Sequence, residues 1–416
     1  MNFELSGTLT SSKQAKNFSY AEISEIDLRQ VKATLVVMHN GRSGAHLFSN
    51  LMDNHSEILS CPPDSLQWIV ENIHSESFLE IRGKGLIHKN LINWIISNCP
   101  FLFKPQNKKI FETLAPVRTD LSGLTVDNKM LVELDSFGII AEQLILVHLK
   151  RYKNELKASD IFSLIHWAYA LARGRSISTN TPVICWQRHN FIHPDSLSTL
   201  LNSTINPILV ATVRQFEDCL DSFFSWLEPH YKTKAEMFRV VIACLTFNLN
   251  KRQKVFPEWA IKFEDMHLNT KSLMKSICYR LGIGFESTLL ETTLDGHPCI
   301  WNVRNELITG TNKNLKRREK LTFLSNADVI FINLLFARFY KQYDYDFNPA
   351  TLEFVNCDPA TLHTNDLVEY LAAIQDSKKS FFANLTFEAA PNHISNLNQI
   401  LKHTWNPALP PLELIF

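Results

Sequence analysis

The stretch Ala33-Thr-Leu-Val-Val-Met-His-Asn-Gly-Arg-Ser-Gly-Ala-His-Leu-Phe-Ser-Asn-Leu-Met52 decides the fold. Its apolar run at residues 34–38 predicts a buried β-strand, and its last part carries apolar residues at helical spacing. The loop between them, Gly41-Arg-Ser-Gly44, has two glycines that permit a tight turn and a close approach of backbone N–H groups to a ligand. The positive end of the helix and the Arg42 guanidinium favour a negative charge there. The sequence therefore predicts a phosphate-binding turn.

Composition limits the classes of protein to which the chain belongs. Its 416 residues suffice for a large core, and 45% apolar with 20% charged residues is typical of a soluble globular protein. The 42 basic and 42 acidic residues cancel, so overall charge gives no argument for a nucleic-acid partner. Any anion binding must therefore be local.

The compartment is inferred from three negative signals. Residues 1–20 lack the pattern of a signal peptide, and no run of about 18 apolar residues predicts a membrane span. The eight cysteines are scattered without a Cys-x-x-Cys pair, which predicts buried thiols rather than a zinc site or a disulfide framework. We therefore expect a cytoplasmic protein.

Strand patterns alternate with helix patterns along much of the chain. Strands are predicted at residues 34–38, 58–61, 183–186, 208–213 and 259–263, and helices follow several of them, including one from the Asn269 cap to Gly282. This alternation predicts an α/β domain with a mostly parallel central sheet flanked by helices. A very apolar helix is expected near residues 326–340.

Two regions interrupt the alternation. Residues 65–180 are mainly helical, most clearly at 160–173, where Ser159 or Asp160 is the expected cap and Gly174 the expected end. Residues beyond 350 have the pattern of a polar tail with short helices. The predicted organisation is an N-terminal extension (1–30), an α/β domain (31–345) with a helical insertion (65–180), and a C-terminal extension (346–416).

A second anion site is predicted after the strand at 208–213. Arg214 follows this strand at its carboxyl end, where open α/β sheets bind ligands. Ser222 lies eight residues later in the next helix, on the same face as Asp218. An arginine and a hydroxyl that converge make a phosphate clamp. Together with the Arg42 turn, this clamp suggests a ligand that is phosphorylated at two places.

The two motifs resemble those of the sulfotransferase family. The family's first motif, roughly Arg/Lys-Ser-Gly-Thr/Ser-Thr, corresponds to Arg42-Ser43-Gly44-Ala45-His46, and the family's His-Pro-x-Ile is similar to Asn54-His-Ser-Glu-Ile58. The second motif, Arg-Asp-Pro-Arg-Asp with a serine eight residues after its first arginine, corresponds to Arg214-Gln-Phe-Glu-Asp218 and Ser222.

Later stretches extend the resemblance over about residues 33–64 and 183–345. Phe263-Glu-Asp-Met266 is similar to the family's Tyr-Glu-Asp-Leu, and Leu281-Gly-Ile283 to its Leu-Gly-Ile. The basic segment Gly310-Thr-Asn-Lys-Asn-Leu-Lys-Arg-Arg318 lies where the family often closes a loop over the nucleotide.

The resemblance implies a P-loop NTPase-like fold of the sulfotransferase type and a defined co-substrate. That co-substrate is 3′-phosphoadenosine 5′-phosphosulfate (PAPS), and no metal is expected. Arg42 is expected to stabilise charge on the bridging oxygen, while Arg214 and Ser222 hold the 3′-phosphate. The other expected nucleotide-binding residues are Gly41, Ser43, Gly44, Ala45, His46, Lys316 and Arg317, with Lys313 and Arg318 in the same basic segment.

The chain departs from the family pattern at two places. Ala45 and His46 replace the usual hydroxyl pair of the first motif, where backbone amides and the His46 ring remain as donors. Phe216 and Glu217 replace the Pro-Arg of the second motif, which removes one positive charge. These departures keep open the alternative of a non-catalytic nucleotide-binding or interaction protein.

Activation of the acceptor hydroxyl requires a general base near the first motif. Asp64 follows the second strand at about the offset where some family members carry a catalytic glutamate, and it is slightly preferred. His189 is the other candidate, and Arg188 beside it could contact the sulfuryl group. Asp64 could equally cap a helix, and His189 could be an ordinary loop residue.

The reaction class has one further alternative, a P-loop kinase that uses ATP. It is disfavoured because the Gly-x-x-x-x-Gly-Lys-Ser/Thr motif and a Mg²⁺-binding loop are both missing from the sequence. The acceptor stays open among a sugar, a lipid, a small metabolite and a protein, since the helical insertion expected to select it carries no interpretable motif.

Overall fold

The computed structural model describes residues 18–38, 43–62, 66, 87–99, 102, 132–188, 204–227, 258–294, 296–298, 300–303, 306–315, 321–346 and 413–415. Within these ranges, six parallel strands form the central sheet, in the order β10-β5-β4-β1-β3-β2. Their bounds are β1 Ala33–Met38, β2 Ile58–Ser60, β3 Val183–Arg188, β4 Pro207–Val213, β5 Glu258–Lys262 and β10 Glu413–Leu414. The predicted α/β class with a mostly parallel sheet is confirmed.

Strand β1 occupies the middle of the sheet because its residues are apolar on both faces. Leu35, Val36 and Val37 are all fully buried. Their side chains alternate between two separate cores, Val36 in one and Leu35 with Val37 in the other. In register, β1 pairs with β3 on one side and with β4 on the other.

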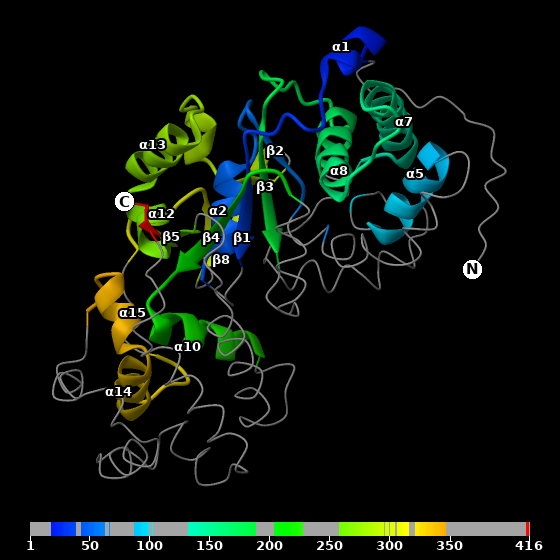
Figure 1. Cartoon of the computed structure of the whole chain (residues 1–416). Helices are drawn as coiled ribbons and strands as arrows, with labels where there is room; N and C mark the ends of the chain where they lie inside the picture. The colour runs from blue at the N-terminus through cyan, green and yellow to red at the C-terminus, as the bar shows by residue number, and fades with distance from the viewer. Residues whose placement is uncertain are drawn as a thin grey trace, which may run out of the picture.

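The order of the strands reverses beside β1. The chain runs from β1 to the edge strand β2, returns through β3, and then crosses to β4 on the opposite side of β1. Such a switch point leaves a crevice outside the carboxyl ends of the strands, where open α/β sheets bind ligands. In Figure 1 the arrows of β3 and β4 point to the side on which α10 (Phe216–Leu227) lies.

Helices cover both faces of the sheet (Figure 1). On one face, α2 (Ala45–Met52), α12 (Phe263–Leu268) and α13 (Thr270–Leu281) share a core with Leu35 and Val37. On the other, α7 (Leu134–Arg151) and α8 (Ala158–Ala172) pack on the core that contains Val36. With α5 (Ile87–Asn98), these last two helices fall within residues 65–180, which confirms the helical prediction for the described part of that region.

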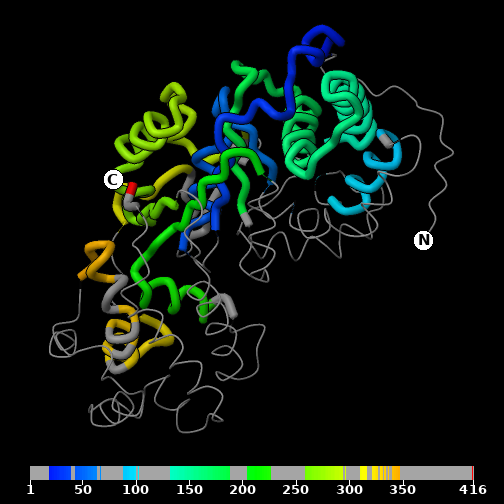
Figure 2. The backbone as a smooth tube through the Cα atoms, viewed as in Figure 1, coloured from blue at the N-terminus to red at the C-terminus, as the bar shows by residue number. Residues whose placement is uncertain are grey.

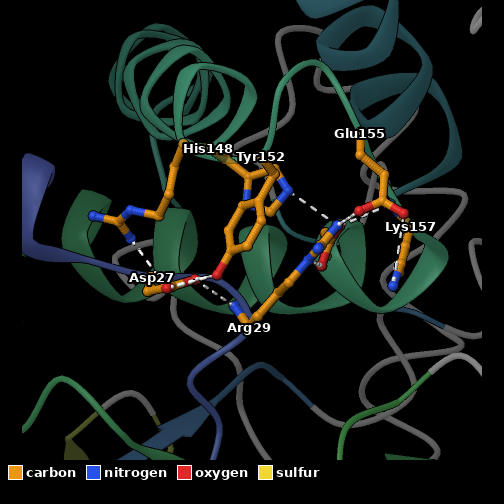
Figure 3. A network of polar contacts seen from close by, with 8 residues as sticks. Asp27, Arg29, His148, Tyr152, Glu155 and Lys157 are labelled. Atoms are coloured by element: carbon orange, nitrogen blue, oxygen red, sulfur yellow. Dashed lines mark hydrogen bonds and ion pairs between the residues drawn. The ribbon is translucent and has the colours of Figure 1, made fainter.

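Residues 20–32 lie beside α7 and α8 (Figure 2). After α1 (Tyr20–Glu25), Arg29 donates from Nε and an Nη atom to the two oxygens of Asp160, each at 3.0 Å. Asp160 is completely buried and also accepts from His148 Nε2 at 3.0 Å and from the Lys157 backbone N–H at 2.8 Å. Figure 3 labels Arg29, His148 and Lys157 of this network. The cap of α8 is therefore Lys157 with Asp160 in its first turn, rather than Ser159 or Asp160.

Several predicted boundaries were wrong. Phe263 begins α12 instead of ending a strand. Asn269 and Gly282 do flank α13 as predicted, but the Asn269 side chain donates to Asp265 and makes no capping hydrogen bond to α13. The apolar helix predicted at 326–340 is two helices, α14 (Asn326–Leu335) and α15 (Ala337–Gln342), which meet at Phe336.

The C-terminal region also differs from its prediction. Leu414 pairs with Ala260 at the edge of the sheet as part of β10, although residues beyond 350 were expected to be a polar tail. Two hairpins were not predicted: β6 (Thr293–Leu294) with β7 (His297–Pro298), and β8 (Ile300–Val303) with β9 (Glu306–Thr309). None of the described helices is long and apolar enough to cross a membrane. The described cysteines are buried free thiols: Cys61, Cys99, Cys185, Cys219 and Cys278.

Candidate anion-binding site

The turn after β1 requires glycine at position 44. Gly44 has φ 101° and ψ 14° and forms the N-terminal cap of α2. A Cβ atom there would lie 2.5 Å from Phe263 Cδ2 and 2.9 Å from Met266 Cε. Gly44 of the first family motif therefore packs directly on the Phe263-Glu-Asp-Met266 stretch. Only glycine fits there, because a side chain would overlap Phe263 and Met266.

The same turn is joined to β4 by a buried hydrogen bond. Ser43 Oγ and Thr212 Oγ1 are 2.8 Å apart, and both side chains are almost fully buried. Thr212 is the second residue before Arg214, so this bond fixes the first anion motif against the second. The signal that could have revealed it is a threonine near the end of an otherwise apolar strand.

His46 is held by a glutamine from β3. Gln187 is buried, and its Nε2 lies 3.1 Å from His46 Nδ1 and 3.4 Å from His46 Nε2. Its Oε1 accepts from Ser49 Oγ at 3.1 Å, one turn further along α2. The ring that replaces the family hydroxyl is thus oriented by the sheet. Ala45 beside it is buried in the core.

Arg214 extends from the carboxyl end of β4 over the start of α12. Its guanidinium carbon lies 4.4 Å from the centre of the Phe263 ring. The strands β4 and β5 end together, with Val213 opposite Lys262, which brings Arg214 to the residues that follow β5. Arg214 of the second family motif therefore contacts Phe263. Gly44 of the first motif packs on the same residue.

Ser222 is half-buried in the second turn of α10. Its helix is anchored by Asp221, whose Oδ1 accepts backbone N–H groups of Thr322 at 2.8 Å and Phe323 at 2.7 Å. The anchored helix gives Ser222 a defined place two turns beyond Arg214.

The departures in the second motif have structural partners. Phe216 stacks on Phe336, the residue between α14 and α15, with ring centres 3.8 Å apart and planes 11° from parallel. Glu217 is buried and accepts from Gln215 Nε2 at 2.9 Å and from the Tyr340 hydroxyl of α15. These residues pack α14 and α15 against the motif, in place of the Pro-Arg of the family pattern.

The first residues of the basic segment turn back onto α12 and α13. The backbone N–H of Asn312 donates to Nδ1 of His267 at 2.9 Å, and Lys313 Nζ donates to Thr270 Oγ1 at 3.0 Å. Burial, followed by the charges of Arg214 and Lys313, lowers the pKa of His267 to about 4. Two cations from distant parts of the sequence therefore lie close enough to this histidine to favour its neutral form.

The residues after α2 are hydrogen-bonded to the loop that follows α13. His55 Nε2 donates to the Gly284 carbonyl at 2.8 Å, and its Nδ1 accepts from the Glu57 N–H at 3.0 Å. The Gly284 N–H in turn donates to Glu57 Oε1 at 3.0 Å. The Asn54-to-Ile58 stretch and the Leu281-to-Ile283 stretch, both quoted for the family resemblance, are therefore neighbours in space.

Several predicted site residues lie outside the described residues. These are Gly41, Arg42, Asp64, His189, Lys316, Arg317 and Arg318, together with the side chain of Arg188. Their roles stay predictions. The described candidates are Ser43, Gly44, Ala45, His46, Arg214, Ser222 and Lys313.

Similarity to known proteins is found among solved structures. No protein-family model matches the sequence, and no curated protein matches it at a significant level. A crystal structure of the sulfotransferase STF9 from Mycobacterium avium is similar over 79% of this chain and 80% of that one, with 13% sequence identity and a TM-score of 0.36. A TM-score of that size is too low to establish a shared fold. The α/β class of this chain therefore rests on its own sheet.

Proposed function

We propose that this chain is a sulfotransferase that moves the sulfuryl group of PAPS to a hydroxyl acceptor. The observation that carries the proposal is the hydrogen bond between Ser43 and Thr212 at 2.8 Å. It joins the turn after β1 to the end of β4, two elements that bear separate predicted phosphate motifs. A ligand with phosphates at two positions suits such a pair of motifs at the edge of one sheet.

The described residues offer hydrogen-bond donors and positive charge that suit the nucleotide. Gly44 allows backbone N–H groups at the start of α2 to approach the 5′-phosphosulfate, and the Gln187-held ring of His46 supplies a further donor. Arg214 supplies the charge for the 3′-phosphate, assisted by Lys313 across His267. Ser222 of α10 is the residue that we propose as a further hydroxyl donor to this phosphate.

The proposed reaction is an in-line displacement. The acceptor oxygen forms a bond to sulfur while the bond from sulfur to the bridging oxygen of the 5′-phosphate breaks. The acceptor proton passes to a general base, for which Asp64 and His189 are the candidates. Negative charge grows on the departing nucleotide, where Arg42 and the amides of the turn stabilise it. The products are the sulfated acceptor and adenosine 3′,5′-bisphosphate (PAP).

A transfer assay tests this function. Purified chain is incubated with ³⁵S-labelled PAPS and panels of sugar, lipid, small-metabolite and protein acceptors. We expect label to move to one acceptor class with the wild type and not with Arg42→Ala. Retention on immobilised PAP without transfer to any panel would favour the non-catalytic alternative. Stabilisation by ATP–Mg²⁺ but not by PAP would favour a kinase.

A further inference from the structure

His267 lies beside the aromatic ring that contacts both predicted anion motifs. It belongs to α12, and its imidazole meets the Phe263 ring edge to face, with ring centroids 4.6 Å apart. The Arg214 guanidinium lies over the same Phe263 ring at 4.4 Å, and an added Cβ at Gly44 would be 2.5 Å from that ring. His267 therefore shares one aromatic neighbour with a residue of each motif.

A backbone hydrogen bond determines which ring nitrogen of His267 carries the proton. The Asn312 N–H donates to Nδ1 at 2.9 Å, so Nδ1 is an acceptor and the neutral ring has its proton on Nε2. Burial and the charges of Arg214 and Lys313 lower the pKa of His267 to about 4, so the ring stays neutral at physiological pH. Nε2 is therefore an N–H donor, and it makes no hydrogen bond to another described residue.

The surroundings of this donor favour an anionic ligand. Lys313 follows Asn312 directly, and its Nζ donates to Thr270 Oγ1 at 3.0 Å. The charges of Arg214 and Lys313 both act on the imidazole of His267. A hydrogen bond to an ionised acceptor such as a phosphate is roughly twice as strong as one between neutral groups. A neutral N–H donor can make such a bond without bringing a third positive charge close to these two.

We propose that His267 is a nucleotide-binding residue, whose Nε2–H donates to the 3′-phosphate that Arg214 also binds. The inference rests on the proposed function for the identity of that phosphate. His267 directly follows the Phe263-Glu-Asp-Met266 stretch and is not among the site residues predicted from the sequence. Its place four residues after Phe263 in the same helix is the only local signal for it.

Two substitutions separate the proposed donor from a merely structural contact with Asn312. Asparagine and glutamine can both accept the Asn312 N–H, but only glutamine is long enough to place its amide donor near the position of Nε2. We expect His267→Asn to bind PAP about tenfold more weakly, since a hydrogen bond to a charged group contributes roughly this much. Binding of 5′-AMP, which lacks the 3′-phosphate, should change little, and His267→Gln should retain most of the affinity for PAP.

Calorimetric titrations of PAP and 5′-AMP into the wild type and both variants measure these affinities. Unchanged PAP affinity in His267→Asn, or equal weakening of PAP and 5′-AMP binding, overturns the proposal.

The matched control is His55→Asn. Nδ1 of His55 likewise accepts a backbone N–H, that of Glu57 at 3.0 Å, but its Nε2 donates to the Gly284 carbonyl at 2.8 Å. The same substitution there should lower Tm without changing the preference for PAP over 5′-AMP. A comparable loss of that preference in His55→Asn would overturn the proposal, because His267→Asn would then act through general stability.

Nitrogen-15 NMR of the histidine side chains observes the proposed donor directly. The free protein should show the Nε2–H tautomer for His267, identified by the loss of its signals in His267→Asn. PAP should shift the Nε2–H signal, and 5′-AMP should not. The Nδ1–H tautomer, or no response to PAP in a protein that binds it, overturns the proposal and leaves the sulfotransferase function intact. A wild type that does not prefer PAP to 5′-AMP refutes both, so the two failures are distinguishable.

Discussion

The guanidinium carbon of Arg214 lies 4.4 Å from the centre of the Phe263 ring. Gly44 also adjoins that ring, since an added Cβ there would be 2.5 Å from Phe263 Cδ2. Phe263 thus contacts a residue of each of the two predicted anion motifs. Its aromatic ring lies against the Arg214 guanidinium, and its bulk leaves no room for a side chain at position 44.

Replacing Phe263 by leucine should weaken nucleotide binding because it removes the aromatic face under Arg214. A cation–π contact contributes about 0.5–2 kcal/mol, so PAP affinity should fall by roughly 2- to 30-fold. The matched control is Phe285→Leu, since Lys275 Nζ lies over that ring at 5.6 Å, away from both motifs. Calorimetry that finds the same change in both variants would show that the Arg214 contact has no special role.

Replacing Gly44 by alanine should be costly for two reasons. The positive φ opposes any Cβ by about 1–2 kcal/mol, and the clash with Phe263 adds about 1–3 kcal/mol. Gly174→Ala is the control, because Gly174 has φ 74° with no atom within 4 Å of the added Cβ. Urea unfolding should show a clearly larger loss for Gly44→Ala. Equal losses would contradict the packing of the turn on α12.

The buried His267 should make the protein sensitive to acid. Its pKa is about 4 in the folded state, against an unfolded value of about 6.5, so the unfolded state binds a proton first as the pH falls. Its contribution to the free energy of unfolding is therefore complete above pH 6.5. It is lost progressively down to about pH 4, by an amount on the order of 3 kcal/mol.

The substitution His267→Gln, which retains an acceptor for the Asn312 N–H, should reduce this acid sensitivity. His166 serves as an internal reference, because it is completely buried with a pKa of about 4 and should keep part of the pH dependence. Denaturant unfolding of both proteins between pH 7.5 and 4.5 gives the comparison. Parallel curves would mean that His267 titrates normally.

Local sequence patterns were sufficient to predict the centre of the fold. Strands β1 and β4 are buried on both faces, so their sequences are nearly continuous apolar runs that can be recognised without structural information. The Arg42 turn and the Arg214 motif were predicted from residue types at the ends of those strands. Ser43 and Thr212, one beside each motif, lie 2.8 Å apart because β1 pairs in parallel with β4.

Other features depend on contacts between distant parts of the chain. Strand β10 has only two residues, Glu413 and Leu414, and is defined by its pairing with β5. Two residues are too few for a periodic sequence pattern to predict a strand. Similarly, the hydrogen bond from Tyr345 to Glu264 joins residues 81 positions apart. Phe263 was assigned to a strand because its apolar side chain continues the preceding run, whereas packing on Gly44 places it at the start of a helix.

The central claim is that the two motifs form one site for a nucleotide with two phosphate positions. Calorimetric titration of PAP into the wild type and into Arg214→Ala tests this most directly. We predict saturable binding to the wild type and affinity lower by about 10- to 100-fold in Arg214→Ala, because a charged hydrogen-bonding partner of the phosphate is lost. The absence of saturable binding to the folded wild type, or the same affinity in both proteins, would contradict it.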